Sequence, residues 1–370
     1  MSVDFFANYD TIKYMKMSLF IGIAAILSLI SMPIIIGICK KLKLYDYHDE
    51  RKIHSGDIPR LGGVGIVTSF VITSAIFLLT HNTLHTMDHL PIYIAAGIIF
   101  VFAIVDDLLN LPAIVKLIVQ LVAVSVVTFN GYHFTQIFGW QLPKVFAIIL
   151  TFGWILGVTN AYNLIDGLDG LCGSLSITTI ITMGILYYLS GNNEAIICFM
   201  LAGSIFGFLC FNWPPAKLFM GDNGSQFLGF MIATLPLYSS GDVFEFNKFL
   251  IMIVLTSFAV FDTIAAIWRR IRDKKPIMAG DRSHLHHKLL NMGYTKQAAL
   301  YLIVFLQTLL CISVIISYYL GRLKGMALLL ESFSFMVLFF SIIHYTNRRV
   351  TLQKQKNEKI ENTSKENNKD

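Results

Sequence analysis

Four oxygen-bearing side chains lie within ten residues at the end of a long apolar run. They fall at every third position of the segment TNAYNLIDGLDGLCGS, namely Asn160, Asn163, Asp166 and Asp169. Carboxylate and amide oxygens bind hard divalent cations, and carboxylates move protons in catalysis. A glycine follows each of the two acids, and such Asp-Gly pairs interrupt a helix. We therefore expect a helix to end here, with the two asparagines on one face of its last turn.

Three further polar clusters interrupt the apolar pattern. VDDLLNLPAIVK contains the adjacent Asp106 and Asp107, and PPAKLFMGDNGSQFLGF contains Asp222 directly after a glycine. The remaining cluster is GDRSHLHHKLL, with Arg282, His284, His286 and His287. Neighbouring residues at a helix end point to different sides, so one of the paired aspartates can face a metal or substrate while the other orients it.

These residue types together suit phosphoryl transfer. The glycine-rich MGDNGS is a tight turn that lets backbone amides approach an oxyanion, while Asp222 supplies a hard oxygen ligand. A few oxygen ligands from the protein suit Mg²⁺ that is bound jointly with phosphates. Arg60, Arg282 and the histidines can bind phosphate oxygens. Metal, carboxylates and basic groups are the parts that such a reaction needs.

Each cluster also has a simpler interpretation. A single aspartate at a helix end can cap the helix or face water. The glycines of PRLGGVG can permit close helix packing instead of phosphate binding. The His-x-His-His segment can be a zinc site, although no cysteine is near and the flanking Asp-Arg pair suits an anion better.

The elements that must carry these clusters are membrane helices. Of the 370 residues, 55% are hydrophobic and 14% are charged, where a soluble domain has about a quarter charged residues. Apolar runs of about 20 residues are what a bilayer core requires of a helix. We predict an all-α polytopic membrane protein with about 11 transmembrane helices. The runs lie near 17–39, 61–80, 90–105, 111–129, 143–163, 172–189, 194–212, 225–240, 248–268, 297–320 and 324–345.

The basic residues predict the orientation of these helices. Most of the 29 lysines and arginines fall in alternate connections, chiefly near 40–60 and 269–296, and in the tail. The positive-inside rule puts that set in the cytoplasm, so the N-terminus is expected outside and the C-terminus in the cytoplasm. All four polar clusters then face the cytoplasm. Ionisable groups at membrane depth are costly and tend to be functional, so a one-sided set favours a site.

The chain divides into two parts by composition. Residues 1–350 are expected to form a single multi-helix membrane domain with cytoplasmic loops. Residues 351–370 are polar and mixed in charge, which predicts a disordered cytoplasmic tail. The net charge of +6 follows from the topology and from phosphate binding, so no nucleic-acid partner is expected.

The order of the clusters resembles a known family. After RKIH and IPRLGG come two aspartates, eight residues and Lys116, followed by NAYNLIDGLDGL, PPAKLFMGDNGS and DRSHLHH. This set resembles the polyprenyl-phosphate N-acetylhexosamine-1-phosphate transferases, the family of phospho-N-acetylmuramoyl-pentapeptide transferase, over about residues 45–290. The muramoyl-pentapeptide enzymes look like PLHHHFE at the histidine segment. DRSHLHH is more similar to the branch that uses UDP-N-acetylglucosamine.

The resemblance implies an activity. GlcNAc-1-phosphate passes from UDP-GlcNAc to undecaprenyl phosphate and gives undecaprenyl-diphospho-GlcNAc and UMP, with Mg²⁺ or, as an alternative, Mn²⁺. This is the first membrane step of a cell-envelope polysaccharide, at the bacterial cytoplasmic (inner) membrane. A homodimer is compatible with the resemblance and is left open.

The resemblance also implies roles for the motif residues. The implied catalytic residues are Asp106, Asp107, Asp166 and Asp169. The implied metal ligands are Asp222 and Asn163. The implied substrate-binding residues are Asn160, Asn163, Lys116, Arg60, Arg282, His284, His286 and His287.

Two alternatives remain at this point. The same reaction can use another UDP-N-acetylhexosamine or UDP-MurNAc-pentapeptide, since a few hydrogen bonds in a loop decide the sugar. A transporter or flippase is the alternative of another class, and such proteins place binding groups near the membrane midplane. The only deep charges here are Lys116, Asp262 and Glu331, and they are scattered in sequence.

Overall fold

The apolar runs form helices in the computed structural model, which describes residues 3–45, 58–81, 89–109, 111–238, 242–274 and 284–367. The first half of the chain contains α1 (Val3–Leu42), α2 (Gly62–His81), α3 (Leu90–Leu109), α4 (Ala113–Thr128) and α5 (Lys144–Ile165). The second half contains α6 (Leu171–Leu189), α7 (Ala195–Asn212), α8 (Asp222–Thr234), η2 (Leu235–Leu237), α9 (Asp242–Arg272), α10 (Leu285–Asn291) and α11 (Lys296–Asn367).

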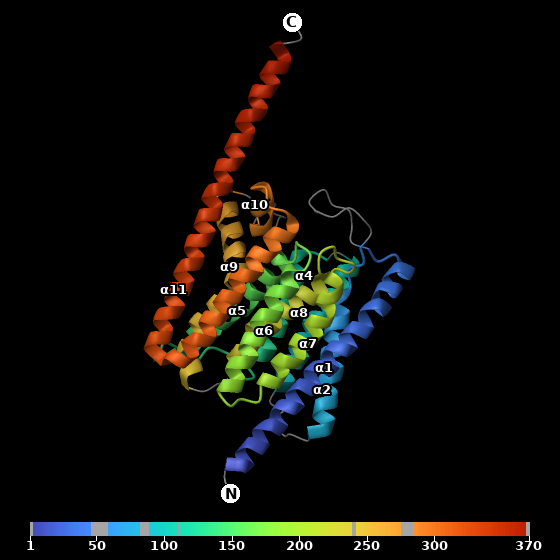
Figure 1. The fold of residues 1–370 in the computed structure, drawn as a ribbon, viewed down its shortest axis with the longest axis vertical. Coiled ribbons are helices and arrows are strands. Elements are labelled where there is room, and N and C mark those ends of the chain that lie inside the picture. The colour runs from blue at the N-terminus through green and yellow to red at the C-terminus, as the bar shows by residue number, and fades with distance from the viewer. Residues whose placement is uncertain are drawn as a thin grey trace.

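Most of these helices are long enough to cross a membrane. Eight helices of the described chain meet the length and hydropathy expected of a span, and α4 is a shorter apolar helix of the same kind. The helix α11 covers two of the predicted runs, and its backbone leaves the helical region at Gly321, where φ is 77°. Figure 1 shows the chain reversing direction within α11. The multi-span helical fold class is thus confirmed, while the count of eleven crossings and their orientation stay predictions.

One small element is not helical. β1 (Gln136–Ile137) and β2 (Trp140–Gln141) form an antiparallel hairpin in the connection between α4 and α5. A two-residue strand has no apolar periodicity, so the sequence pattern did not indicate it.

The short helix α8 is the centre of the bundle. It packs against α2, α3, α5 and α6, and every residue from Asn223 to Thr234 is buried. Glycine permits the close approach to α5, since a Cβ at Gly229 would lie 2.8 Å from the Cβ of Tyr162. Its N-terminus, at the half-buried Asp222, lies among these longer helices and is a positively polarised position.

The polar tail corrects one prediction. Residues 351–367 continue α11 as a helix, where disorder was expected. No glycine or proline follows Gly325, and the tail is rich in the good helix formers Lys, Gln and Glu, so the preceding span can nucleate it. Lys354 also ties its first turns to α10 by donating to the carbonyl of Asn291 at 2.8 Å.

Candidate active site

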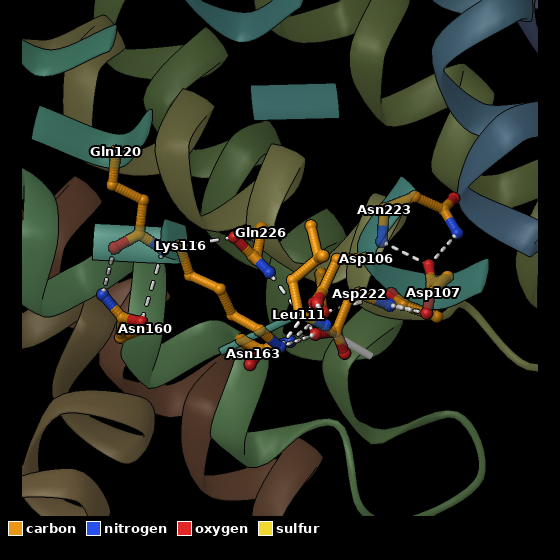
Figure 2. Close-up of polar contacts among 12 residues, drawn as sticks. Asp106, Asp107, Leu111, Lys116, Gln120, Asn160, Asn163, Asp222, Asn223 and Gln226 are labelled. Carbon is orange, nitrogen blue, oxygen red and sulfur yellow. Dashed lines mark hydrogen bonds and ion pairs between the residues drawn. The ribbon is translucent and has the colours of Figure 1, made fainter. Parts of the chain in front are cut away.

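Three of the four polar clusters meet where the ends of α3, α4, α5 and α8 converge. Their side chains form one contact network, drawn in Figure 2. In Figure 1 this end of the bundle lies toward the C-terminal tail and away from the N-terminus. The predicted gathering of the clusters at one end is therefore found.

Asp107 anchors the N-terminus of α8. Its Oδ2 accepts hydrogen bonds from the backbone N–H of Asn223 at 3.0 Å and from the Asn223 amide at 2.6 Å. Its Oδ1 accepts one from the N–H of Asp222 at 3.2 Å. A carboxylate bonded to the first N–H groups of a helix is also stabilised by the helix dipole. Both oxygens are thus committed, and Asp107 is the member of the pair that orients.

Asp106 and Asp222 share a lysine. The Lys116 ammonium forms an ion pair with Asp106 Oδ2 and a hydrogen bond of 3.3 Å to Asp222 Oδ2. Asp106 is buried, and its Oδ1 accepts the N–H of Leu111 at 2.9 Å. The side chain of Asp222 is 34% exposed, so a ligand can reach it. Asp106, Lys116 and Asp222 are called the carboxylate centre below, and their contact with a substrate stays a prediction.

A chain of hydrogen-bonded side-chain amides extends from Asp222 to α5 and supports the carboxylate centre. Gln226 donates to Asp222 Oδ2 at 3.4 Å and accepts from Gln120 at 3.1 Å. Gln120 and Asn160 exchange two hydrogen bonds, at 2.8 and 3.3 Å. The second amide hydrogen of Asn160 goes to its own helix, at the carbonyl of Leu156. Asn160 therefore acts here through Gln120, and its predicted contact with substrate stays a prediction.

The two glutamines were missed by the sequence interpretation. Gln120 follows Lys116 by four residues, and Gln226 follows Asp222 by four residues. Residues four apart lie on the same helix face, so a polar residue at that spacing inside an apolar run was the available signal.

Asn163 lies beside the first turn of α8. Its Nδ2 donates to the Ser225 hydroxyl at 3.0 Å, and that hydroxyl is 3.1 Å from the carbonyl of Gly221. The amide donates through nitrogen, so its oxygen is the atom that it can offer to a metal or a substrate. Asn163 is half-buried and adjoins Asp222, which fits the predicted pairing of these two residues.

The glycines of PRLGGVG pack against the α8 loop. The N–H groups of Gly62 and Gly63 donate to the carbonyls of Phe219 and Met220 at 2.8 and 2.9 Å. A Cβ at Gly63 would overlap Asn223, and one at Gly221 would overlap the carbonyl of Arg60. The close-packing interpretation of these glycines is therefore the one that the structure supports. The Arg60 side chain is half-buried beside this loop, and its binding of phosphate stays a prediction.

Asp166 and Asp169 lie in the loop that follows α5. Asp166 ends the helix with φ −75° and ψ 50°, as the Asp-Gly pattern predicts. Asp169 is buried, and its Oδ2 accepts the N–H of Ala216 at 3.1 Å. Gly170, at φ 76°, donates to the Asn212 side chain at 2.9 Å. Asp169 thus joins this loop to the PPAK connection, and its catalytic role stays a prediction.

One of the three histidines, His286, lies against that same loop. The ring of His286 is buried, and a Cβ at Gly167 would stand 2.7 Å from it, so only glycine leaves room. His287 is half-buried, with ring centroids 4.3 Å apart in the pair His286 and His287. His284 is buried and bonded to Asp262 on α9 at 2.9 Å. Arg282 falls outside the described residues.

The charge state of His286 follows from its surroundings. Burial, followed by the neighbouring His287 and His284, lowers the pKa of His286 well below its usual range. Within the described residues neither ring nitrogen has a hydrogen-bond partner. A neutral imidazole can donate or accept one hydrogen bond at each nitrogen, so His286 suits a polar contact better than an ion pair with phosphate.

The residues of the centre fit magnesium better than zinc. Within the described part of the chain no three His, Cys, Asp or Glu side chains are arranged to hold a metal ion, at the histidines or at the carboxylates, so the zinc alternative and the magnesium site both stay predictions. Asp222 and Asn163 offer hard oxygen atoms from adjacent positions. Mg²⁺ keeps several waters and usually takes one or two carboxylates plus substrate phosphates, so this small set suits it.

Comparison with known proteins gives consistent matches. The model of glycosyl transferase family 4 matches residues 89–240, which hold every site residue discussed except those of the PRLGGVG segment and of the α9–α10 part. The chain is 37% identical to the probable undecaprenyl-phosphate N-acetylglucosaminyl 1-phosphate transferase of Bacillus subtilis (strain 168), over 80% of this chain and 84% of the relative. It is 31% identical to the decaprenyl-phosphate N-acetylglucosaminephosphotransferase of Mycolicibacterium smegmatis, over 70% and 71%. It is 27% identical to the undecaprenyl-phosphate alpha-N-acetylglucosaminyl 1-phosphate transferase of Escherichia coli (strain K12), over 74% and 76%.

Proposed function

The chain belongs to the polyprenyl-phosphate N-acetylhexosamine-1-phosphate transferases of glycosyl transferase family 4, and on this premise we propose that it transfers GlcNAc-1-phosphate from UDP-GlcNAc to undecaprenyl phosphate. The products are undecaprenyl-diphospho-GlcNAc and UMP. The observation that carries the proposal is the carboxylate centre, in which one lysine bridges two aspartates beside the N-terminus of α8. The names of the relatives in Bacillus subtilis and Escherichia coli support the acceptor and the sugar.

The reaction joins two anions, so the protein must screen their charge. A lipid-phosphate oxygen attacks the phosphorus that carries the sugar, and the bond from that phosphorus to the UMP oxygen breaks. Lys116 is the cation of the carboxylate centre and can turn from the carboxylates toward the phosphates. Asp222 and Asn163 would hold Mg²⁺, which supplies charge neutralisation at the phosphate oxygens when it is bound.

Direct attack is the mechanism that the side chains favour. The acceptor phosphate is already largely ionised near pH 7, so Asp106 need accept only its remaining proton. Asp107 has both oxygens bonded to α8 and is not poised as a nucleophile. Incubation with UDP-GlcNAc labelled in the sugar-linked phosphate, without lipid, tests this: a labelled protein would contradict direct attack.

The location of the site supports a cytoplasmic active face. A nucleotide sugar is soluble in water and an undecaprenyl tail is soluble in the bilayer, so the transfer must occur where helix ends meet water. The chain carries the apolar helices of a multi-pass membrane protein. We place the polar end of the bundle at the cytoplasmic side of the bacterial inner membrane, with eleven crossings and with a monomer or a homodimer as the assembly.

The transporter alternative has less support. Lys116 and Asp262 both lie near the end of the bundle that holds the site, and each has a carboxylate or imidazole partner there. A transport site would instead gather such groups near the midplane in broken helices.

A membrane assay with a panel of labelled nucleotide sugars tests the function. Membranes that contain the protein are incubated with undecaprenyl phosphate, Mg²⁺ and UDP-GlcNAc, UDP-GalNAc or UDP-MurNAc-pentapeptide. We expect a lipid-linked product and UMP with UDP-GlcNAc. A product with UDP-GalNAc or UDP-MurNAc-pentapeptide alone would change the proposed substrate. No product from any of these donors, or the release of UDP in place of UMP, would contradict the proposed reaction.

A further inference from the structure

A buried carboxylate on α9 contacts the histidine segment. Asp262 lies within an apolar span and is 1% exposed. An isolated charge there would be costly, so such residues usually have a specific partner and a specific task. No role is assigned to Asp262 by the four polar motifs, since it belongs to none of them.

Both oxygens of Asp262 bond to the start of α10. Oδ2 lies 2.9 Å from Nδ1 of His284, and Oδ1 accepts the backbone N–H of Leu285 at 2.8 Å. Leu285 is fully buried, which anchors the same turn by packing. One contact therefore holds the backbone and the other holds the ring, so the imidazole of His284 has a fixed place and orientation.

The carboxylate also selects the proton position on the ring. A carboxylate has no hydrogen to give, so Nδ1 must carry the proton of this hydrogen bond. The other nitrogen, Nε2, is left for a further partner. A hydrogen bond at one ring nitrogen decides the role of the other in the same way when a histidine binds a metal.

Contacts link His284 to the rest of the site. Its ring is nearly parallel to that of His286, at 7° and with centroids 6.1 Å apart. His286 lies against Gly167 in the loop after α5, and Asn163 of that helix contacts the first turn of α8. Asp262 thus holds a histidine whose neighbour, His286, contacts the loop that borders the site.

We infer that Asp262 is a positioning residue of the transferase. It holds Nδ1 of His284 in the protonated form and the ring in place, and so presents Nε2 to the nucleotide-sugar substrate. This inference rests on the proposed function for the identity of the bound substrate. The tautomer of His284 does not depend on that function and can be measured separately.

Replacement of Asp262 by Asn is the decisive change. Asparagine has nearly the same shape as aspartate, but one of its two terminal atoms is an NH2 group. One of the two partners, His284 or Leu285, then meets a donor in place of an acceptor. With Leu285 N–H on the oxygen, the amide donates to Nδ1 and moves the ring proton to Nε2. We expect kcat/KM for UDP-GlcNAc to fall about 10–100-fold. This is the loss found when a side chain that orients a metal-binding histidine is replaced. The KM for undecaprenyl phosphate should stay unchanged.

A double-mutant cycle separates this role from a general structural one. If Asp262 acts through His284, then the double variant Asp262→Asn with His284→Ala should be no slower than His284→Ala alone. Losses that multiply would overturn the inference. Asp262→Glu, which restores a carboxylate, should recover part of the activity. Ser257→Ala is the matched control, because that buried hydroxyl of α9 bonds to its own helix at Val254, and it should leave kcat/KM unchanged.

A measurement on the unaltered protein covers the case in which the Asp262 variants do not fold. Nitrogen-15 spectra of histidine-labelled protein report which ring nitrogens carry protons, and the His284 signal is the one that His284→Ala removes. We expect Nδ1 of His284 to be protonated. An unprotonated Nδ1 would overturn the inference even if UDP-GlcNAc is a substrate. Failure of every nucleotide sugar in the transfer assay would instead contradict the proposed function and leave this result standing.

Discussion

The carboxylate centre and the histidine segment differ in how completely their side chains are bonded. In the carboxylate centre each charged group has an opposite charge as its partner. In the histidine segment His284 bonds to the Asp262 carboxylate, and His286 is buried with both ring nitrogens lacking a partner in the described chain. The first region is assembled before any substrate arrives. The histidine segment holds ring nitrogens that a substrate can still hydrogen-bond. Substitutions in the carboxylate centre and in the histidine segment should therefore have different effects.

Removal of a charge from the carboxylate centre should have the largest effect. Asp222→Asn and Asp106→Asn each leave Lys116 with one carboxylate partner and remove an oxyanion from the proposed metal and base positions. We expect each change to abolish turnover, by at least about 1,000-fold, the scale for loss of a charged catalytic group. The membrane assay with UDP-GlcNAc measures the rate.

Both variants should still insert into the membrane, because each substitution is nearly isosteric. Yield in membranes and elution as a single species in detergent provide the control. Wild-type rates from both variants would contradict the assignment of the centre.

Asp107 should differ from its neighbour in affecting stability as well as rate. Its carboxylate accepts three hydrogen bonds from Asp222 and Asn223, two of them from backbone N–H groups at the start of α8. Asp107→Ala leaves these donors buried without an acceptor, which costs about 1–3 kcal/mol for a group of this kind. We expect a lower unfolding temperature in detergent and a rate reduced by about 100-fold through displacement of α8.

The matched control is Asp106→Asn, which should lower the rate without a comparable loss of unfolding temperature. Equal losses of stability in the two variants would remove the distinction between an orienting aspartate and one that faces substrate.

The contact between the two regions can be broken at one glycine. A methyl group at Gly167 would stand within 2.7 Å of the His286 ring, so Gly167→Ala must displace either the loop or α10. We expect about a 10-fold loss in kcat/KM for UDP-GlcNAc, with less effect on the lipid acceptor.

The pair Gly167→Ala with His286→Ala tests the cause of that loss. Truncating the histidine creates the missing space, so the combined loss should be smaller than the product of the two single losses. Multiplicative losses would show that the methyl group acts elsewhere. Gly157→Ala on the preceding helix α5 is a control, because a Cβ there meets nothing within 4 Å.

Motif spacing predicted the carboxylate centre better than it predicted the support around it. Asp106, Lys116 and Asp222 are charged residues in an apolar chain, so their residue types alone indicated a site. Gln120, Gln226 and Asp262 needed the packing of helices that are far apart in sequence. A contact between α9 and α10 depends on how two elements meet, and periodicity describes one element at a time.

The fold shows the same division. Apolar runs predicted the helices, since burial in a bilayer requires such runs whatever the tertiary arrangement. The tail of α11 was wrongly predicted to be disordered, because low hydropathy alone does not reveal that a span nucleates the helix that follows it. The central position of α8 was not predicted either, since a buried helix and a span have similar compositions.

The smallest expected effect is the pH response of α10. Burial, with His287 and His284 nearby, holds the pKa of His286 well below the value of about 6.5 that it has in an unfolded chain. His286 therefore binds a proton more readily when α10 is open than when α10 is packed. The free energy of opening α10 is thus highest above pH 6.5 and falls as the pH drops below that value. The free energy of opening should therefore be lower at pH 5.5 than at pH 7.5. Hydrogen exchange of the α10 amides measures this opening, and comparison with His286→Gln at each pH removes the contributions of His284, His287 and the exchange chemistry. An equal acid response in the wild type and in His286→Gln would mean that His286 is not held neutral, and the histidine segment would then resemble the carboxylate centre in its electrostatics.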